Sequence, residues 1–226
     1  MSYSVPLHKR ITRAAMRFAF RGIFHLLCNV RIISPQNIPS QGAYIVAHNH
    51  ISLFEPPFVL SFWPHTPEAI AGADVFDRPW QKYMVRAYAA IPVHRGAYDR
   101  KVIDTMLNLL DQGMPLVIAP EGGRSHNVGM RRAHSGIAYI AARAQVPVLP
   151  VGIYGSTEDM LARALRLERP LLEMRIGQPF YLPAITGRGK ARRQSRQQNA
   201  DLVMNNIARL LPESYHGVYS GAVPLS

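Results

Sequence analysis

Two side chains that can share a proton lie close together in a short polar segment. His50 follows the apolar run 44–47, and Glu55 lies five positions further on, directly before two prolines. A neutral imidazole takes a proton from a hydroxyl when one ring nitrogen is free and the ring is held in place. A carboxylate bonded to the other nitrogen fixes the tautomer and stabilises the imidazolium. The spacing predicts a general base, His50, oriented by Glu55 and acting on a hydroxyl of the substrate.

Simpler roles for these residues stay open. A histidine beside a carboxylate most often forms a hydrogen bond that has a structural role. Ser52 is a plausible helix N-cap, and Glu55 three positions later completes the pattern of a capping box. His48, His50 and Glu55 also suit a zinc hydrolase. Because the sequence shows no cluster for a fourth ligand, no metal site is predicted.

Other chemically suited residues follow two further apolar runs. Arg95 comes after the short strand expected at 90–94, and Glu121, Gly122, Gly123 and Arg124 come after the strand expected at 116–119. Glycines let the backbone approach a ligand, and their amides can bind an anion or an oxyanion. An arginine offers a planar fork for phosphate. An ordinary Gly-Gly turn with a solvated arginine is the simpler interpretation.

Apolar runs that alternate with amphipathic segments predict an α/β fold, in which a mixed, largely parallel sheet is flanked by helices. Proteins with such sheets bind their ligands at the carboxyl ends of the strands. Prolines in the run 146–154 predict a bulge or incomplete strand pairing there. Residues 186–198 are expected to form a mobile or partly helical basic surface segment. Strands are expected at 30–34, 42–47, 69–73, 90–94, 116–119 and 146–154, with edge strands at 173–176 and 180–182, and helices at 8–30, 58–63, 77–89, 100–112, 137–144 and 200–211.

The amino-terminal segment, residues 1–30, is expected to be an amphipathic helical unit preceding an α/β domain over residues 31–226. Arg10, Arg13, Arg17 and Arg21 recur on one face of the predicted helix, beside a wide apolar face. A basic stripe beside an apolar face is typical of a helix that lies in the membrane interface. The alternative is a helix packed on the domain with its arginines in water.

The composition indicates an anionic partner. The chain has 26 Lys and Arg against 14 Asp and Glu, a net charge of +12, which suits nucleic acid, an anionic membrane surface or a phosphorylated substrate. No apolar run reaches a membrane span, and no signal-peptide pattern is evident. The single Cys28 excludes an internal disulfide and fits a reducing compartment. We therefore expect a cytoplasmic protein, peripheral on the inner face of the cell membrane.

A basic nucleic-acid-binding module would explain the charge but not the strand-end His50 and Glu55. No basic motif interleaved with aromatic residues is visible, so no nucleic-acid partner is predicted.

Four separated stretches together resemble the glycerophospholipid acyltransferases, the family of the bacterial 1-acyl-sn-glycerol-3-phosphate acyltransferases. The family motifs are Asn-His-x4-Asp, a strand ending in a basic residue, Phe-Pro-Glu-Gly-Thr-Arg-Ser, and Val-Pro-Val-x-Pro-Val. Here they read Asn49–Glu55, Val93–Gly96, Ala119–Ser125 and Val146–Val151, in family order. Two positions depart from the family pattern: Glu55 replaces Asp, and Gly123 replaces Thr, which leaves the acceptor open.

This resemblance implies transfer of a fatty acyl group to the free hydroxyl of a lysophosphatidate-like glycerolipid, in phospholipid synthesis or remodelling. The donor is an acyl thioester, acyl-CoA or acyl-carrier protein, and no other cofactor is implied. His50 and Glu55 would be catalytic, Arg95 and Arg124 would hold the acceptor phosphate, Gly122 and Gly123 would meet the oxyanion, and Glu121 would brace the loop. Another lysophospholipid or a glycolipid is the alternative acceptor.

Overall fold

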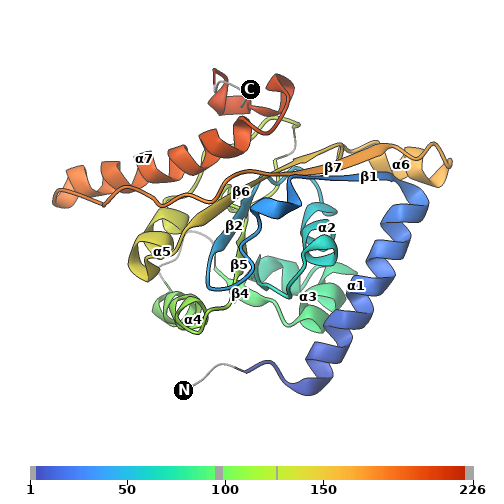
Figure 1. Ribbon diagram of the computed structural model, residues 1–226, viewed down its shortest axis with the longest axis horizontal. Helices are drawn as coiled ribbons and strands as arrows, with labels where there is room; N and C mark the ends of the chain where they lie inside the picture. Colours follow the sequence, from blue (N-terminus) through green and yellow to red (C-terminus); the bar gives the residue numbers. More distant parts are fainter. Residues whose placement is uncertain (1–3, 95–98, 126, 222–226) are drawn as a thin grey trace.

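A seven-stranded sheet forms the centre of the molecule (Figure 1). The computed structural model describes residues 4–94, 99–125 and 127–221. The strand order is β1-β7-β6-β2-β5-β3-β4, and all neighbouring strands are parallel except β6 and β7. The predicted mixed, largely parallel sheet is therefore confirmed. The strands are β1 (Asn29–Ile33), β2 (Ile45–His48), β3 (Glu68–Gly72), β4 (Ile91–Val93), β5 (Leu116–Ile118), β6 (Val148–Tyr154) and β7 (Leu171–Ile176).

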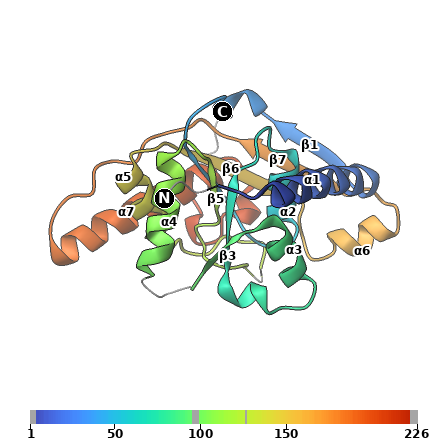
Figure 2. The ribbon, with the colours of Figure 1, turned by 90° about the horizontal axis from the view of Figure 1, so that it is seen from below.

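Helices cover both faces of this sheet (Figures 1 and 2). Side chains from α4, α5 and α7 build the core on one face, and side chains from α1, α2 and α6 build the core on the other. Successive residues of β2 alternate between the two cores, with Ile45 in the first and Val46 in the second. The helices are α1 (Leu7–Leu27), α2 (Glu55–Phe62), α3 (Gln81–Tyr88), α4 (Arg100–Asp111), α5 (Gly136–Ala144), α6 (Met160–Leu165) and α7 (Gly189–Ala208).

The central strands are apolar because both of their faces are covered. All four residues of β2 are buried, as are Val148–Ile153 of β6. Continuous antiparallel pairing of β6 with β7 begins at Val151, and Val148 pairs separately with Phe180. Pro150 lies between these two points, so the prediction of incomplete pairing at a proline is confirmed.

Several element predictions were wrong. β7 is an interior strand, because β1 pairs along its outer side, and the segment 180–182 contributes one isolated bridge at Phe180. Residues 186–198 and 200–211 were predicted as two segments, yet α7 runs unbroken from Gly189 to Ala208. Its Arg- and Gln-rich first half favours helix, and the second half anchors it on the sheet through apolar side chains. The short helix α6 was not predicted.

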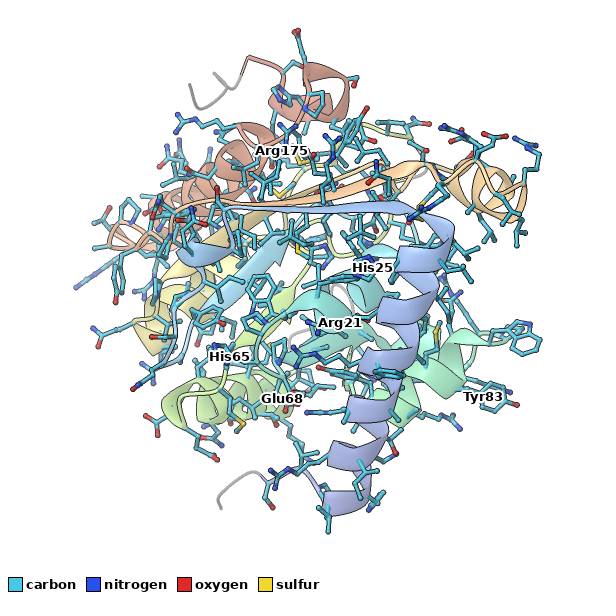
Figure 3. All side chains as sticks on the ribbon, turned by 45° about the vertical axis from the view of Figure 1, so that its right-hand side comes forward. Arg21, His25, His65, Glu68, Tyr83 and Arg175 are labelled. Atoms are coloured by element: carbon cyan, nitrogen blue, oxygen red, sulfur yellow. The ribbon has the colours of Figure 1, made fainter. Side chains whose placement is uncertain are left out.

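Three of the four arginines in the α1 stripe, Arg13, Arg17 and Arg21, face the protein, which corrects the predicted basic outer face, whereas Arg10 is exposed. Arg13 is buried, and its guanidinium donates to both carboxylate oxygens of Glu68 at 2.6 and 2.8 Å and to the Tyr88 carbonyl. Arg17 and Arg21 donate to backbone carbonyls at the end of α2, including Ser61. Figure 3 shows Arg21 and Glu68 on the inner side of α1. The exposed face is instead apolar and carries Leu7, Ile11, Phe18, Ile23 and Leu26.

Cationic side chains at the carboxyl end of α2 are favourably placed, because helix C-termini carry partial negative charge and unpaired carbonyls. Ring contacts of Phe24 with Phe58 and Phe62 add an apolar contact between α1 and α2.

None of the helices in the described part of the chain is long and apolar enough to span a membrane.

Candidate active site

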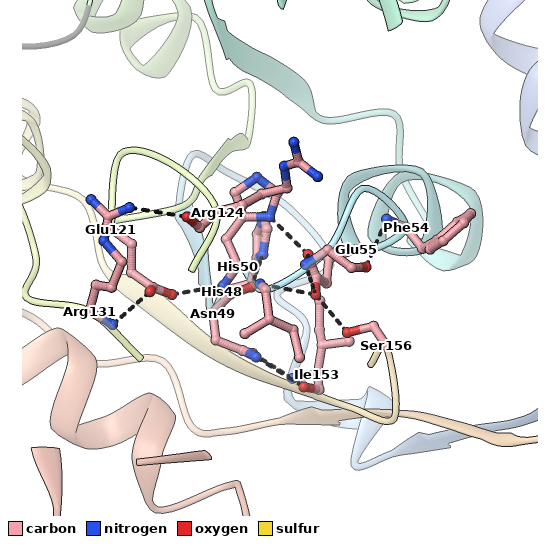
Figure 4. Close-up of polar contacts among 12 residues, drawn as sticks. His48, Asn49, His50, Phe54, Glu55, Glu121, Arg124, Arg131, Ile153 and Ser156 are labelled. Carbon is pink, nitrogen blue, oxygen red and sulfur yellow. Dashed lines mark hydrogen bonds and ion pairs between the residues drawn. The ribbon is translucent and has the colours of Figure 1, made fainter. Parts of the chain in front are cut away.

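His50 lies just beyond the carboxyl end of β2, and its ring contacts Glu55. His50 Nδ1 is 2.8 Å from Glu55 Oε2 (Figure 4). The Glu55 side chain is fully buried, whereas 15% of the His50 side chain is exposed. The pair predicted from the sequence is therefore assembled, with the carboxylate inside and the imidazole at the surface of a cavity. Glu55 is the first residue of α2, and its longer side chain, relative to Asp, still reaches His50.

Glu55 receives three further donors. The amides of Ile51 and Ser52 donate to its carboxylate at 3.2 and 2.9 Å, and the Ser156 hydroxyl donates to Oε1 at 2.6 Å. An ionised carboxylate accepts hydrogen bonds and donates none. The His50 proton therefore lies on Nδ1, and Nε2 is left with a lone pair. Half of the expected capping box is present. The Glu55 carboxylate accepts from the Ser52 amide, but the Ser52 hydroxyl accepts from the Phe54 amide in place of the Glu55 amide.

Asn49 holds the turn that presents His50. Its side-chain amide donates to the Ile153 carbonyl at 3.0 Å and accepts from the Ile153 amide at 2.7 Å. This two-point contact with β6 replaces a strand pairing at the point where β2 ends. The turn is thereby attached to a buried central strand of the sheet, which supports His50.

His48 is buried and neutral. Burial, aided by the nearby His50, lowers the pKa of its imidazole to about 4. Its Nδ1 is 2.7 Å from the Asn49 carbonyl, to which it donates. In the described ranges of the chain, no three His, Cys, Asp or Glu side chains converge as metal ligands. The His48 ring lies edge-on to the His50 ring, with centroids 5.9 Å apart, at the wall of the same cavity.

Glu121 joins the loop after β5 to the turn after β2. Its two carboxylate oxygens accept the amides of His50 at 2.8 Å and Arg131 at 2.7 Å, and the residue is fully buried. Burial raises the pKa of this carboxyl to about 7, and the two hydrogen bonds partly oppose that rise. The Ser125 amide also donates to the His50 carbonyl at 2.8 Å. Two loops distant in sequence are thus held as one unit.

The Gly-Gly-Arg turn lies beside this unit. Gly122 has a φ of +65°, and a Cβ there would lie 2.5 Å from the His134 ring, so the position requires glycine. The Gly122 amide is used within the turn, where it donates to the Ala119 carbonyl. The Gly123 amide has no hydrogen-bond partner among the residues that the structure describes. The Arg124 carbonyl accepts from the Arg131 guanidinium.

A cavity of about 360 Å³ opens from this group of residues. His50, Gly122, Gly123 and Arg124 line it together with side chains from α1, α2, α3 and β3. The lining is predominantly apolar and includes Met16, Phe20, Leu53, Leu60, Ile70, Val75, Met84 and Val85. The arrangement joins a free imidazole nitrogen, an arginine and an extended apolar space.

The structure therefore gathers His50, Glu55, Glu121, Gly122, Gly123 and Arg124 at the carboxyl edge of the sheet. Arg95 lies outside the described residues. Ser156 was missed by the sequence analysis. The signal that would have found it is its place just after β6, whose carboxyl end lies at the same edge as that of β2.

Comparisons with known proteins identify a family and a similar fold. A family model described as Acyltransferase matches residues 29–154. The 1-acyl-sn-glycerol-3-phosphate acyltransferase of Bacillus subtilis (strain 168) is 23% identical over 72% of this chain and 79% of its own length. A probable enzyme of the same name from Mycoplasma pneumoniae is 24% identical over 82% and 71%. The crystal structure of the 1-acyl-sn-glycerophosphate acyltransferase from Thermotoga maritima shares the fold, with a TM-score of 0.61, 21% identity, and coverage of 86% and 79%.

Proposed function

Because the chain belongs to the acyltransferase family, we propose that it moves a fatty acyl group from an acyl thioester to the free hydroxyl of a lysophosphatidate-like glycerolipid. The donor is acyl-CoA or acyl-carrier protein. One observation carries the proposal: the imidazole of His50, held by Glu55 at 2.8 Å, opens onto an apolar cavity beside Arg124.

The reaction follows from the free lone pair on His50. Nε2 takes the proton of the acceptor hydroxyl, and the hydroxyl oxygen attacks the thioester carbonyl carbon. The carbonyl oxygen becomes an oxyanion, to which the Gly123 amide is a suitable donor, whereas the Gly122 amide is already engaged. When the intermediate collapses, the carbon–sulfur bond breaks, and the thiolate takes the proton back from the imidazolium. The products are an acylated lipid and a free thiol carrier.

The cavity and the charged residues suit the two substrates. An apolar space of about 360 Å³ fits a fatty acyl chain, which gains free energy on leaving water. Arg124 faces this space and can bind the acceptor phosphate in a bidentate manner. Arg95 is proposed for the same role on the family resemblance. The names of the Bacillus and Mycoplasma relatives support a lysophosphatidate acceptor. Another lysophospholipid or a glycolipid would react by the same chemistry.

The surface of α1 supports a peripheral position on the inner face of the cell membrane. Its outward face is apolar, and α3 beside it adds Tyr83, visible in Figure 3, and Trp80, which is 82% exposed. Trp80 has a φ of +65°, a strained conformation for a large side chain. Amphipathic aromatic rings favour the membrane interface. A net charge of +12 adds attraction to anionic lipid.

The proposed function is tested by measuring thiol release from acyl-CoA with a panel of lysolipids. We expect the wild-type protein to turn over with lysophosphatidate, and His50→Ala to lower kcat by at least about 1,000-fold, because the base is lost. His65→Ala is the matched control, since His65 precedes β3 and so lies at the opposite edge of the sheet. Turnover retained in His50→Ala would remove His50 from the mechanism. Turnover confined to another lysolipid would replace the acceptor.

A further inference from the structure

Ser156 is a donor to Glu55 that lies outside the matched family region. Its hydroxyl is 2.6 Å from Glu55 Oε1, and both residues are fully buried (Figure 4). The family match ends at residue 154, two positions earlier. Apart from His50, Ser156 is the one side-chain donor to this carboxylate among the residues that the structure describes.

The Ser156 bond restrains the orientation of the carboxylate. Terminal torsions of glutamate are broad, so a buried carboxylate keeps one orientation only through its partners. Oε2 accepts His50 Nδ1, Oε1 accepts Ser156 and the Ile51 amide, and the Ser52 amide lies 2.9 Å from both oxygens. Without the hydroxyl, Oε1 loses its shortest bond, and the two backbone amides that remain restrain the plane of the carboxylate less tightly. The Nδ1 contact, and with it the direction of the free Nε2, would then be less well defined.

The position of Ser156 is set by the turn after β6. Gly155 has a φ of +91°, and a Cβ there would lie 2.0 Å from the Leu171 carbonyl oxygen, so the turn requires glycine. The Gly155 amide donates to the Tyr215 hydroxyl at 3.0 Å. Tyr215 is buried, and its ring packs against Tyr154 with centroids 5.2 Å apart. The backbone that presents Ser156 is thus held by a residue some sixty positions away.

Tyr215 belongs to a carboxyl-terminal segment, residues 212–221, that follows α7 near the C-terminus marked in Figure 1. This segment also holds the loop between β5 and α5. The Met130 amide donates to the Tyr215 carbonyl at 2.9 Å, the Val218 amide donates to the Met130 carbonyl, and the Ala133 amide donates to the Tyr219 hydroxyl. The adjacent Arg131 amide is the one that Glu121 accepts. The segment therefore contacts both loops that support the pair of His50 and Glu55.

We infer that Ser156 is a positioning residue for the His50–Glu55 dyad and that Tyr215, from the carboxyl-terminal segment, holds Ser156 in place. The chain of contacts runs from the Tyr215 hydroxyl to the Gly155 amide, then from the Ser156 hydroxyl to Glu55 and His50. Neither Ser156 nor Tyr215 needs to touch substrate. The expected change in kcat rests on the proposed acyl transfer, whereas the expected change in the contact between His50 and Glu55 does not.

The kinetic experiment compares Ser156→Ala, Tyr215→Phe and the double variant in thiol release. We expect Ser156→Ala to lower kcat by about 10- to 100-fold with KM changed less than twofold, because misoriented supporting groups cost rate rather than binding. Tyr215→Phe keeps the ring and should lower kcat by a smaller factor, on the order of threefold. Since both act on Glu55 through one contact chain, the double variant should match Ser156→Ala rather than the product of the two effects.

Matched controls separate this role from a general loss of hydroxyl groups. Ser220→Ala removes an exposed hydroxyl from the same segment, and Tyr181→Phe removes one from a tyrosine that is 70% exposed. Both should leave kcat unchanged. A kcat within twofold of wild type in Ser156→Ala, or multiplicative effects in the double variant, would overturn the proposal. Should Ser156→Ala fail to fold, a wild-type kcat in Tyr215→Phe would overturn it.

A second measurement needs no activity. The Nδ1 proton of His50 in its bond to Glu55 should give a low-field proton resonance, assigned by its absence in His50→Ala. We expect this resonance to broaden through faster exchange in Ser156→Ala and Tyr215→Phe and to persist in both controls. An unchanged resonance in both variants would refute the positioning role. If the wild-type protein shows no acyl transfer while the resonance responds, the proposed function fails and the positioning role stands.

Discussion

At the residue scale, Glu121 and His48 respond to pH in opposite directions. Burial raises the pKa of Glu121 from 4.5 to about 7, so the folded protein holds this proton more tightly than the unfolded chain. Its contribution to stability is complete below pH 4.5 and is lost as the pH rises through about 7. Burial lowers the pKa of His48 from 6.5 to about 4, so its contribution is present above pH 6.5 and is lost as the pH falls to about 4.

In Glu121→Gln, the pH dependence that His48 gives to the free energy of unfolding should therefore no longer be masked by that of Glu121. In the wild-type protein the two effects nearly cancel between about pH 5 and pH 7, and each amounts to about 2 kcal/mol over that range. Relative to wild type, the free energy of unfolding of Glu121→Gln should rise by about 2 kcal/mol from pH 5 to pH 7, as measured by urea denaturation. Glu158→Gln, at an exposed position, is the control. A difference that does not change with pH would contradict the buried titration of Glu121.

At the element scale, the position of α1 depends on polar contacts as well as apolar packing. Arg13 joins it to β3 through Glu68 and to the end of α3 through the Tyr88 carbonyl, and its guanidinium lies 4.5 Å from the Tyr88 ring centroid. Arg17 and Arg21 join it to the end of α2. Because α1, α2 and α3 all line the apolar cavity, these contacts also maintain its walls.

Arg13→Ala should lower the free energy of unfolding by about 3 kcal/mol, because a buried carboxylate loses two short hydrogen bonds and the guanidinium leaves a gap. Arg10→Ala, one turn earlier on an exposed position, should change it by less than about 0.5 kcal/mol. Urea denaturation of the two variants makes the comparison. Equal values for both would mean that the inward arginines do not hold α1 in place.

At the scale of the whole molecule, the proposed membrane contact is expected on the side where exposed apolar side chains of α1 lie. The outward face of α1 presents Ile11, Phe18 and Leu26, and Tyr83 lies beside it (Figure 3). The cavity that leads to His50 has walls from the inward sides of the same helices, so under the proposed function the helix that contacts lipid also borders the space for the acyl chain. Arg13, Arg17 and Arg21 of α1 are engaged within the protein, so attraction to lipid depends on the remaining basic residues.

Phe18→Glu should weaken binding to vesicles that contain anionic phospholipid by at least about 10-fold in a co-sedimentation assay, because an exposed apolar anchor is replaced by a negative charge. Phe18 is 84% exposed, so the fold should be unaffected. The control is Val218→Glu, which places the same charge on the exposed carboxyl-terminal segment. Equal loss in both variants would indicate a charge effect without a specific contact face.

Much of the fold and site followed from local patterns. Buried strands read as apolar runs, and His50 and Glu121 lie just beyond the ends of predicted strands. A strand end is a local property, and parallel strands bring such ends to one edge of the sheet. The short sequence separation of His50 and Glu55 made their contact predictable as well.

Only the tertiary structure decided which way α1 faces and which distant groups support the dyad. A helical period places four arginines on one face, but it does not say whether that face meets lipid, water or buried partners such as Glu68. Ser156 contacts Glu55 across 101 residues of chain, and Tyr215 contacts Gly155 across 60. Such contacts depend on how separate strands and loops pack, and no local pattern encodes that arrangement.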